Sequence, residues 1–200
     1  MSYTALHWAA VNGHAEIAQL LIDAGANLEP TNSQSATPLF MAAQHRQPKM
    51  VTILVAAGAD VNTKTRSKMT PLHVCAQNND LDSCRTLLAA ASLATADLDT
   101  AREEELDTDG NIIRNSVDDH PDRAGIDKPM SSGQGPLHLA AKKGHDPMCA
   151  LLIEHGARTD YSDAFGKTAA MYATTEELRT KIVRPLQKKA RKKNNEPPTN

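Results

Sequence analysis

The sequence predicts an all-α solenoid of about five helix-turn-helix units with short hairpin or turn connections, and two repeated landmarks support this prediction. The first is a heptapeptide related to T-P-L-H-x-A-A, spaced by 33, 33, 65 and 33 residues, which begins at Thr4, Thr37, Thr70, Gly135 and Thr168. The second is an apolar segment ending in Gly-Ala, which keeps the same register and begins at Leu20, Ile53 and Leu151. Two landmarks in one register are not expected by chance.

Each unit carries signals for two short helices. A threonine cap is followed by proline at the first helical position, as in Thr37-Pro38 and Thr70-Pro71. The leucine and the paired alanines of the heptapeptide share one helical face, and the small alanines allow a second helix to approach closely. The second helix is predicted to end at a left-handed glycine, which is Gly25, Gly58 or Gly156.

Two short helices cannot bury an apolar face alone, so successive units must stack. The heptapeptide and its 33-residue period resemble the ankyrin repeat. This resemblance implies a non-enzymatic adaptor or scaffold that binds a partner protein through a concave surface and hairpin tips. It places the contacts at first-helix positions Val11, Asn12, Gln44, His45, Gln77, Asn78, Lys142 and Lys143, and at hairpin positions Ser33, Gln34, Ala36, Arg66, Ser67, Met69, Gln134, Phe165 and Lys167.

Three further features follow from the register of the repeat. Met69 and Phe165 place apolar side chains where solvent is expected, which is typical of interface anchors. Leu54 to Asn62 resembles the leucine-to-asparagine spacing that an asparaginyl hydroxylase modifies in ankyrin repeats. Asn62 is therefore a candidate hydroxylation site, with a turn-stabilising asparagine as the favoured alternative. One apolar stripe is predicted to be core and consists of Trp8, Met41, Val74, Leu139 and Tyr172.

The predicted organisation has four parts: repeats one to three at 1–91, an acidic and flexible insertion at 92–123, repeats four and five at 124–186, and a disordered basic tail at 187–200. The insertion has ten acidic and three basic residues. A decayed repeat is the alternative, but its register would put Glu105 at the core leucine. Because Ala91 replaces the helix-ending glycine, the helix through Leu87 and Leu88 is expected to continue.

The fifth unit is degenerate and is predicted to cap the stack. Thr174 and Glu177 fit a capping box that opens a last helix, which Pro185 would kink. Its buried face is predicted to carry Leu178, Ile182 and Leu186.

The basic tail supports a second function class. It is either a solvated end or a site for nuclear import, nucleic acid or an anionic membrane, and the acidic insertion could mask it. The cluster comprises Lys188, Lys189, Arg191, Lys192 and Lys193.

Composition limits the remaining classes. A formal charge of −2 and 3% aromatic residues argue against a protein that binds nucleic acid over its whole surface. Three scattered cysteines are predicted to be reduced thiols, which indicates the cytoplasm, the nucleus or both. No secretory signal and no membrane-spanning apolar run is expected.

The sequence contains no recognisable catalytic motif, and it predicts no cofactor, metal or small-molecule substrate. His7, His73 and His138 recur at one repeat position, which predicts a structural role. The three cysteines fall at positions of small buried residues. The segment from Asp107 to Asn111 resembles the start of a calcium loop but lacks the required glycine and glutamate further on.

Overall fold

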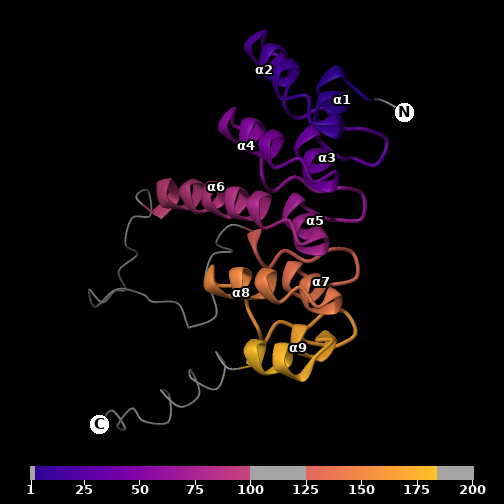
Figure 1. Ribbon diagram of the computed structural model, residues 1–200, viewed down its shortest axis with the longest axis vertical. Helices are drawn as coiled ribbons and strands as arrows, with labels where there is room; N and C mark the ends of the chain where they lie inside the picture. Colours follow the sequence, from indigo (N-terminus) through magenta and orange to yellow (C-terminus); the bar gives the residue numbers. More distant parts are fainter. Residues whose placement is uncertain (1–2, 100–124, 184–200) are drawn as a thin grey trace, which may run out of the picture.

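The structure, a computed structural model, describes residues 3–99 and 125–183, which form a stack of helical hairpins in two layers (Figure 1). The inner layer contains α1 (Ala5–Asn12), α3 (Pro38–Gln44), α5 (Pro71–Asn78), α7 (Pro136–Lys143) and α9 (Ala169–Tyr172). The outer layer contains α2 (Ala15–Asp23), α4 (Pro48–Ala56), α6 (Leu81–Asp99), α8 (Asp146–Glu154) and the helical residues 176–183. Apart from one isolated bridge between Ser162 and Thr168, the described residues form no β-structure. The predicted all-α solenoid is confirmed.

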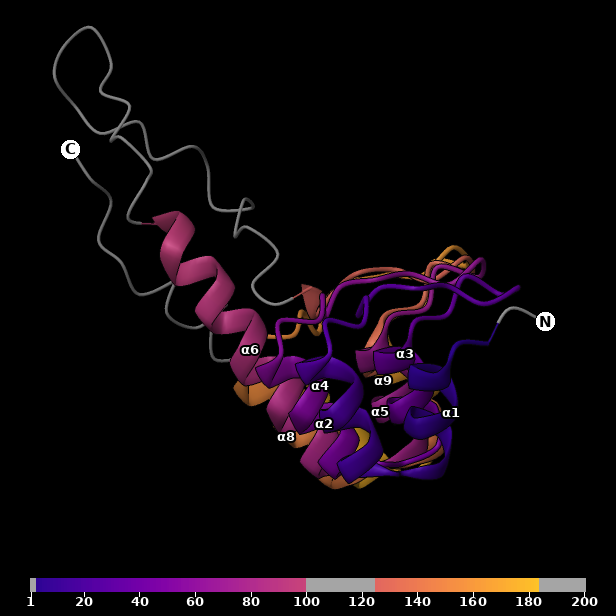
Figure 2. The ribbon, with the colours of Figure 1, turned by 90° about the horizontal axis from the view of Figure 1, so that it is seen from above.

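Extended hairpin arms connect the units and project from the helices to one side (Figure 2). We define these arms as residues 30–36, 63–69, 128–134 and 161–167, which occupy equivalent places in the repeat. Each arm leads directly into the cap of the next inner helix, so that the arms and the inner helices meet at an angle. The exposed side of the arms and inner helices is called the concave surface below.

The inner helices begin with the predicted caps. The Thr37 hydroxyl accepts a hydrogen bond from the Phe40 backbone N–H at 3.3 Å, as expected of an N-cap threonine. Where the unit has histidine, its Nδ1 instead accepts from the backbone N–H of the cap residue. The N–Nδ1 distances are 3.2 Å for Thr4–His7, 3.2 Å for Thr70–His73 and 3.3 Å for Gly135–His138. The structural role predicted for these histidines is confirmed.

The same histidines join each unit to the next one. Because Nδ1 accepts a hydrogen bond, the hydrogen of the neutral ring is on Nε2, which therefore acts as the donor. Nε2 donates to a buried carbonyl at the end of the following arm. These bonds are His7 to Ala36 at 3.1 Å, His73 to Gln134 at 3.3 Å and His138 to Lys167 at 3.1 Å. The second unit has Phe40 at this position, and a phenyl ring cannot form the bond.

The core lies between the layers. Ala42 and Ala43 of α3 are fully buried, and so are Met50, Val51 and Leu54 of α4. The predicted close approach of the second helix onto paired alanines is therefore confirmed. Cys75, Cys84 and Cys149 are also buried and unpaired, at the small-residue positions where the sequence places them.

Trp8 departs from the predicted apolar core stripe because 57% of its surface is exposed. In other units this position packs against the preceding arm: the Met41 sulfur contacts Asn32, and the Tyr172 hydroxyl contacts Asp163. The Trp8 ring lies beside that of Tyr3, with ring centroids 5.0 Å apart. The prediction is wrong for Trp8, which no arm within residues 3–99 and 125–183 covers. The remaining stripe residues, Met41, Val74, Leu139 and Tyr172, are buried or half-buried.

The outer helices end as predicted at left-handed glycines, with φ of 80° at Gly25, 93° at Gly58 and 95° at Gly156. The inner helices are followed by a second left-handed position, which Gly13 and Gly144 occupy in two units. Arg46 adopts the same conformation in the second unit with φ of 55°. A side chain with a β-carbon is strained there.

Replacing Arg46 by glycine is expected to raise the free energy of unfolding by about 1 kcal/mol, because the substitution removes the left-handed strain. Equilibrium unfolding in urea measures this change. Arg46→Ala is the matched control, since it removes the same exposed side chain but keeps the β-carbon, and it should leave the midpoint unchanged. Equal stabilisation by Arg46→Gly and Arg46→Ala would show that the gain does not come from relief of backbone strain at this position.

The chain continues past Ala91 as a helix, as the missing glycine predicts. α6 has 19 residues, whereas α2, α4 and α8 have nine each, and it projects beyond the outer layer (Figures 1 and 2). At residue 125 the chain returns in register, with Ile126 buried at the place of Val61. Residues 100–123 of the predicted insertion lie outside the described residues, and the domain boundaries stay predictions.

The fifth unit is short, and one detail of its prediction is wrong. Thr175, not Thr174, caps the last helix: its hydroxyl accepts a hydrogen bond from the Leu178 backbone N–H at 3.2 Å. Leu178 and Ile182 are fully buried, as predicted. The proposed kink at Pro185, the side chain of Leu186 and the basic cluster at 188–193 lie outside the described residues.

Candidate partner-binding surface

Successive hairpin arms are joined by backbone hydrogen bonds. Arg66 N–H donates to the Gln34 carbonyl at 3.0 Å, Ser131 N–H to the Ser67 carbonyl at 2.9 Å, and Ala164 N–H to the Ser132 carbonyl at 3.3 Å. The middle bond joins arms on opposite sides of the predicted insertion. The four arms therefore form one continuous row.

Side-chain acceptors close individual arms. Asn32 Oδ1 accepts from the backbone N–H groups of Gln34 at 2.8 Å and of Ala36 at 3.0 Å. In the last arm Asp163 Oδ1 accepts from Phe165 and Lys167, both at 2.9 Å. These bonds fix the backbone of the arms before any partner binds.

Asp163 also links the last arm to the arm before it and to α9. Its Oδ2 accepts from the Tyr172 hydroxyl at 2.6 Å and from Gln134 Nε2 at 3.4 Å. Burial opposes ionisation of this carboxyl, but the hydrogen bonds from Tyr172, Lys167, Phe165 and Gln134 outweigh it and lower the pKa of Asp163 to about 2. Asp163 is thus ionised, and both of its carboxylate oxygens already accept hydrogen bonds from within the protein.

The far ends of the inner helices are tied together in a similar way. Asn78 Nδ2 donates to the Gln44 carbonyl at 3.2 Å, His145 Nε2 lies 3.1 Å from the Gln77 carbonyl, and Gln47 Nε2 donates to the Val11 carbonyl at 3.4 Å. These bonds use backbone carbonyls, so the side chains of Gln44 and Gln77 stay exposed. A row of exposed polar groups results.

The structure places most of the predicted contact residues on the concave surface. Val11 and Asn78 are half-buried, and the exposed ones are Asn12, Ser33, Gln34, Gln44, His45, Arg66, Ser67, Gln77, Lys142, Lys143, Phe165 and Lys167. Phe165 is 73% exposed, as expected for an apolar anchor. Their role in partner binding stays a prediction.

Three predicted contact residues do not fit that role. Ala36 and Gln134 are buried, with 1% and 7% of their surfaces exposed, because their carbonyls accept the bonds from His7 and His73. Met69 is half-buried and packs against the core, so it is not an exposed anchor. Register alone identified these positions without showing which side of the arm each side chain occupies.

The arms carry further cations that the repeat pattern did not single out. Lys64 and Lys68 are exposed and Lys128 is half-buried on the same row as Arg66. Their signal in the sequence is the excess of positive charge in residues 63–69, which contain no acidic residue.

Asn62 belongs to a series of turn contacts between units. Glu29 Oε1 accepts from the Asp60 N–H at 2.9 Å, and Asp127 Oδ1 accepts from the Arg158 N–H at 3.0 Å. At the equivalent place Asn62 Oδ1 lies directly against Gly125, where a β-carbon would clash with it. This environment matches the turn-stabilising alternative, and hydroxylation of Asn62 stays a prediction.

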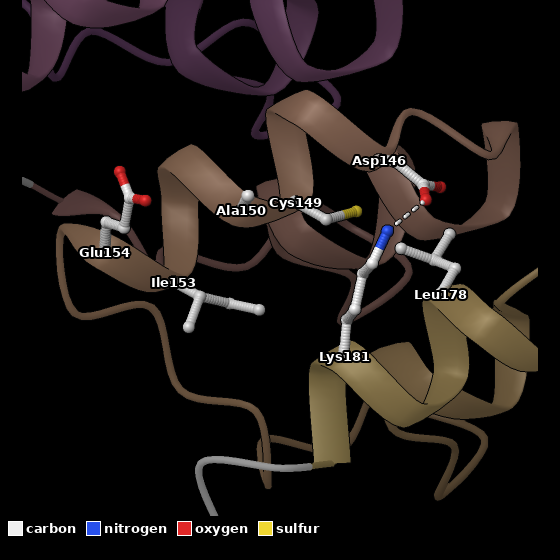
Figure 3. Close-up of a pocket in the computed structure, with 7 residues that line it drawn as sticks. All are labelled: Asp146, Cys149, Ala150, Ile153, Glu154, Leu178 and Lys181. Carbon is white, nitrogen blue, oxygen red and sulfur yellow. Dashed lines mark hydrogen bonds and ion pairs between the residues drawn. The ribbon is translucent and has the colours of Figure 1, made fainter.

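A shallow pocket of about 220 Å³ lies in the outer layer between α8 and the helical residues 176–183 (Figure 3). Lys181 crosses its mouth and pairs with Asp146 at 3.2 Å. Burial raises the pKa of the Cys149 thiol in its wall to about 12, so this thiol is not a nucleophile at neutral pH. Pockets that enclose small ligands are commonly larger than about 300 Å³, and we interpret this one as a packing seam.

The described residues offer little for catalysis. Burial likewise raises the pKa of Cys84 to about 12 and that of Cys75 well above its ordinary value. No cluster of three or more His, Cys, Asp or Glu side chains within residues 3–99 and 125–183 is arranged to hold a metal ion. Across the same residues, no helix combines the length and hydropathy needed to span a bilayer.

Comparison with known families agrees with this architecture. A family model described as Ankyrin repeats (3 copies) matches residues 1–65 and 108–196, and one described as Ankyrin repeats (many copies) matches residues 48–88. No curated protein matches the chain. The family matches cover well over half of the 200 residues and agree with the repeat register, the capping histidines and the stacked hairpins. The chain therefore belongs to the ankyrin repeat family.

Proposed function

We propose that this protein is a non-enzymatic adaptor or scaffold of the cytoplasm or nucleus that binds a partner protein through its concave surface and hairpin tips. Ankyrin repeats are generally protein–protein interaction modules. The observation that supports the proposal most is the continuity of the concave surface across the insertion. His73 and the Ser67–Ser131 bond join the third and fourth units as directly as other successive units are joined.

The rigidity of this surface favours binding. Association requires loss of conformational freedom, and a surface that is already ordered loses less. Here the arms are held by Asn32, Asp163 and the bonds between arms, while the exposed side chains of Gln44 and Gln77 remain available. The energy of partner contacts is therefore not spent on ordering the backbone.

The buried ionisable groups support a binding role over a catalytic one. His73 and His138 use both ring nitrogens in structural hydrogen bonds, and burial lowers the pKa of each ring. The buried thiols are protonated at neutral pH. Each of these groups is occupied in holding the fold.

Proximity labelling in cells, followed by affinity capture of the full chain, tests the proposal. The variant Gln44→Glu/Gln77→Glu changes two exposed residues of the concave surface, and Gln19→Glu/Arg85→Glu changes two exposed residues of the outer helices. We expect stoichiometric partners to be lost with the first variant and kept with the second. Equal recovery with both variants, each with unchanged thermal unfolding, would overturn the proposed binding surface.

A further inference from the structure

Charge is separated between the two sides of the stack. The described arms and inner helices carry seven cations, Lys64, Arg66, Lys68, Lys128, Lys142, Lys143 and Lys167, and Asp163 is their single acidic residue. The helices of the outer layer instead carry nine acidic residues and four basic ones, and α2 and α8 contain no Lys or Arg. The concave surface is therefore the basic side of a molecule whose formal net charge is −2.

These cations lack neutralising partners within the described part of the chain, where none of the seven takes part in an ion pair. Asp163 does not compensate them, because it is 94% buried in side-chain and backbone hydrogen bonds and its acceptor positions are filled. Two cations of the outer layer are paired instead: Lys181 with both Asp146 and Glu177, each at 3.2 Å, and Arg179 with Glu176 at 3.7 Å.

Two of the cations converge in the last two units. Lys142 Nζ, from the end of α7, lies 6.0 Å from the centroid of the Tyr172 ring, and Lys167 Nζ, from the last arm, lies 5.6 Å from the same centroid. Like charges drawn to one ring repel each other, and a bound anion relieves that repulsion. Phe165 stands on the same arm as Lys167 with 73% of its surface exposed.

We propose that the concave surface binds an acidic segment of its partner protein, whose carboxylates meet Lys142, Lys143 and Lys167 and whose apolar side chain covers Phe165. This inference rests on the proposed function and adds the chemistry of the partner. Complementary charge speeds encounter and suppresses wrong partners, and the apolar anchor adds area that is removed from water.

The same cations could also attract a polynucleotide, but three observations favour an acidic polypeptide. Aromatic residues make up only 3% of the chain, so a single strand would find few rings on which to stack its bases. Two lysine ammonium groups already lie 6.0 and 5.6 Å from the centroid of the Tyr172 ring, and a base stacked on the face they occupy would have to displace them. The formal net charge of −2 is unfavourable for a polyanion that follows the whole surface, whereas a short acidic segment meets only the cations of the concave surface.

Fluorescence anisotropy with the full chain tests the inference. The probe is a short labelled peptide of glutamates interspersed with leucines, and the comparison probes are the same peptide with glutamine for glutamate and a labelled single-stranded oligothymidylate. We expect the acidic peptide to bind tightest and to weaken as salt rises. The variant Lys142→Glu/Lys143→Glu/Lys167→Glu should weaken it about tenfold or more, and Phe165→Ala should weaken it about threefold.

The outer-layer variant Lys49→Glu/Arg85→Glu/Arg179→Glu reverses the same number of charges and is the matched control, which should bind the acidic peptide as the unchanged chain does. All variants keep the tail and the insertion, so differences between them report on the concave surface alone. A second variant neutralises the same lysines without reversing their charge, in case charge reversal disturbs the fold: Lys142→Gln/Lys143→Gln/Lys167→Gln. Thermal unfolding of every variant is measured in parallel.

Three outcomes would overturn the inference: no binding of the acidic peptide, equal binding by the concave and outer variants, or tighter binding of oligothymidylate. These outcomes are distinct from failure of the proposed function. Captured partners could be lost with Gln44→Glu/Gln77→Glu while their binding is unaffected by salt and by the lysine substitutions. That result would support the proposed binding surface and contradict the inference that the partner segment is acidic.

Discussion

His73→Ala is expected to lower the free energy of unfolding by about 4 kcal/mol. The substitution leaves the Thr70 N–H and the Gln134 carbonyl without their buried partner, and each unsatisfied group costs about 1–3 kcal/mol. It also opens a cavity at a fully buried position, which adds to the loss. Because this ring joins the third unit to the fourth across the insertion, the two halves of the stack should also unfold less cooperatively.

The second unit provides the control, since Phe40 occupies the equivalent position without the hydrogen bond. His73→Phe also removes both hydrogen bonds but fills the site with a ring and avoids the cavity, and it should cost about half as much as His73→Ala. His45→Ala removes an exposed imidazole and should change stability by less than about 0.5 kcal/mol. Urea unfolding followed by circular dichroism measures all three. A loss below about 1 kcal/mol for His73→Ala would contradict a linking role for this ring.

Acid should destabilise the protein by about 3 kcal/mol between pH 6.5 and 4, through His73 alone. Burial lowers the pKa of this ring from 6.5 to about 4. The folded ring therefore binds fewer protons than the unfolded one in this interval. The contribution of His73 to stability is therefore fully present above pH 6.5, the pKa of the unfolded ring, and decreases as the pH falls toward about 4, the pKa of the folded ring. Burial also lowers the pKa of His138, which acts in the same direction.

Urea midpoints at about pH 7 and about pH 4.5 measure the acid effect, and His73→Phe is its matched control. In that variant the difference between the two midpoints should shrink by most of the expected loss. Asp163 does not interfere, because its pKa of about 2 places its own loss of stability below pH 3.8. An unchanged pH dependence in His73→Phe would show that the buried imidazole is not the sensor.

The sequence predicts the helices well because each unit repeats the same local signals. Threonine and proline at the helix start and glycine at the helix end act within a few residues, so their effect can be derived without knowing the tertiary contacts. The same local reasoning explains α6, because the absence of glycine at Ala91 lets the helix continue. It was off by one residue at the last cap, where adjacent threonines offer the same chemistry and Thr175 is used.

The candidate site was harder to predict because exposure depends on neighbours. Ala36 and Gln134 stand at arm positions that the family resemblance assigns to partner contacts, but their carbonyls are the acceptors of buried histidines, and Met69 packs onto the core. Trp8 is exposed because no described arm covers it. Lys142, Lys167 and Tyr172 come from three different elements of two units. Their proximity is a tertiary contact, so it could not be predicted from any short stretch of sequence.

The Ser67–Ser131 bond and the His73–Gln134 bond have a consequence for how the chain can change. These two bonds join the third and fourth units directly, without help from the residues between them in the sequence. The length of the insertion therefore does not affect the geometry of the concave surface. Loop closure costs only about 0.6 kcal/mol for each doubling of loop length, so the third and fourth units form a natural splice point. A reporter or a whole additional module can be grafted there without altering the bonds that close the stack.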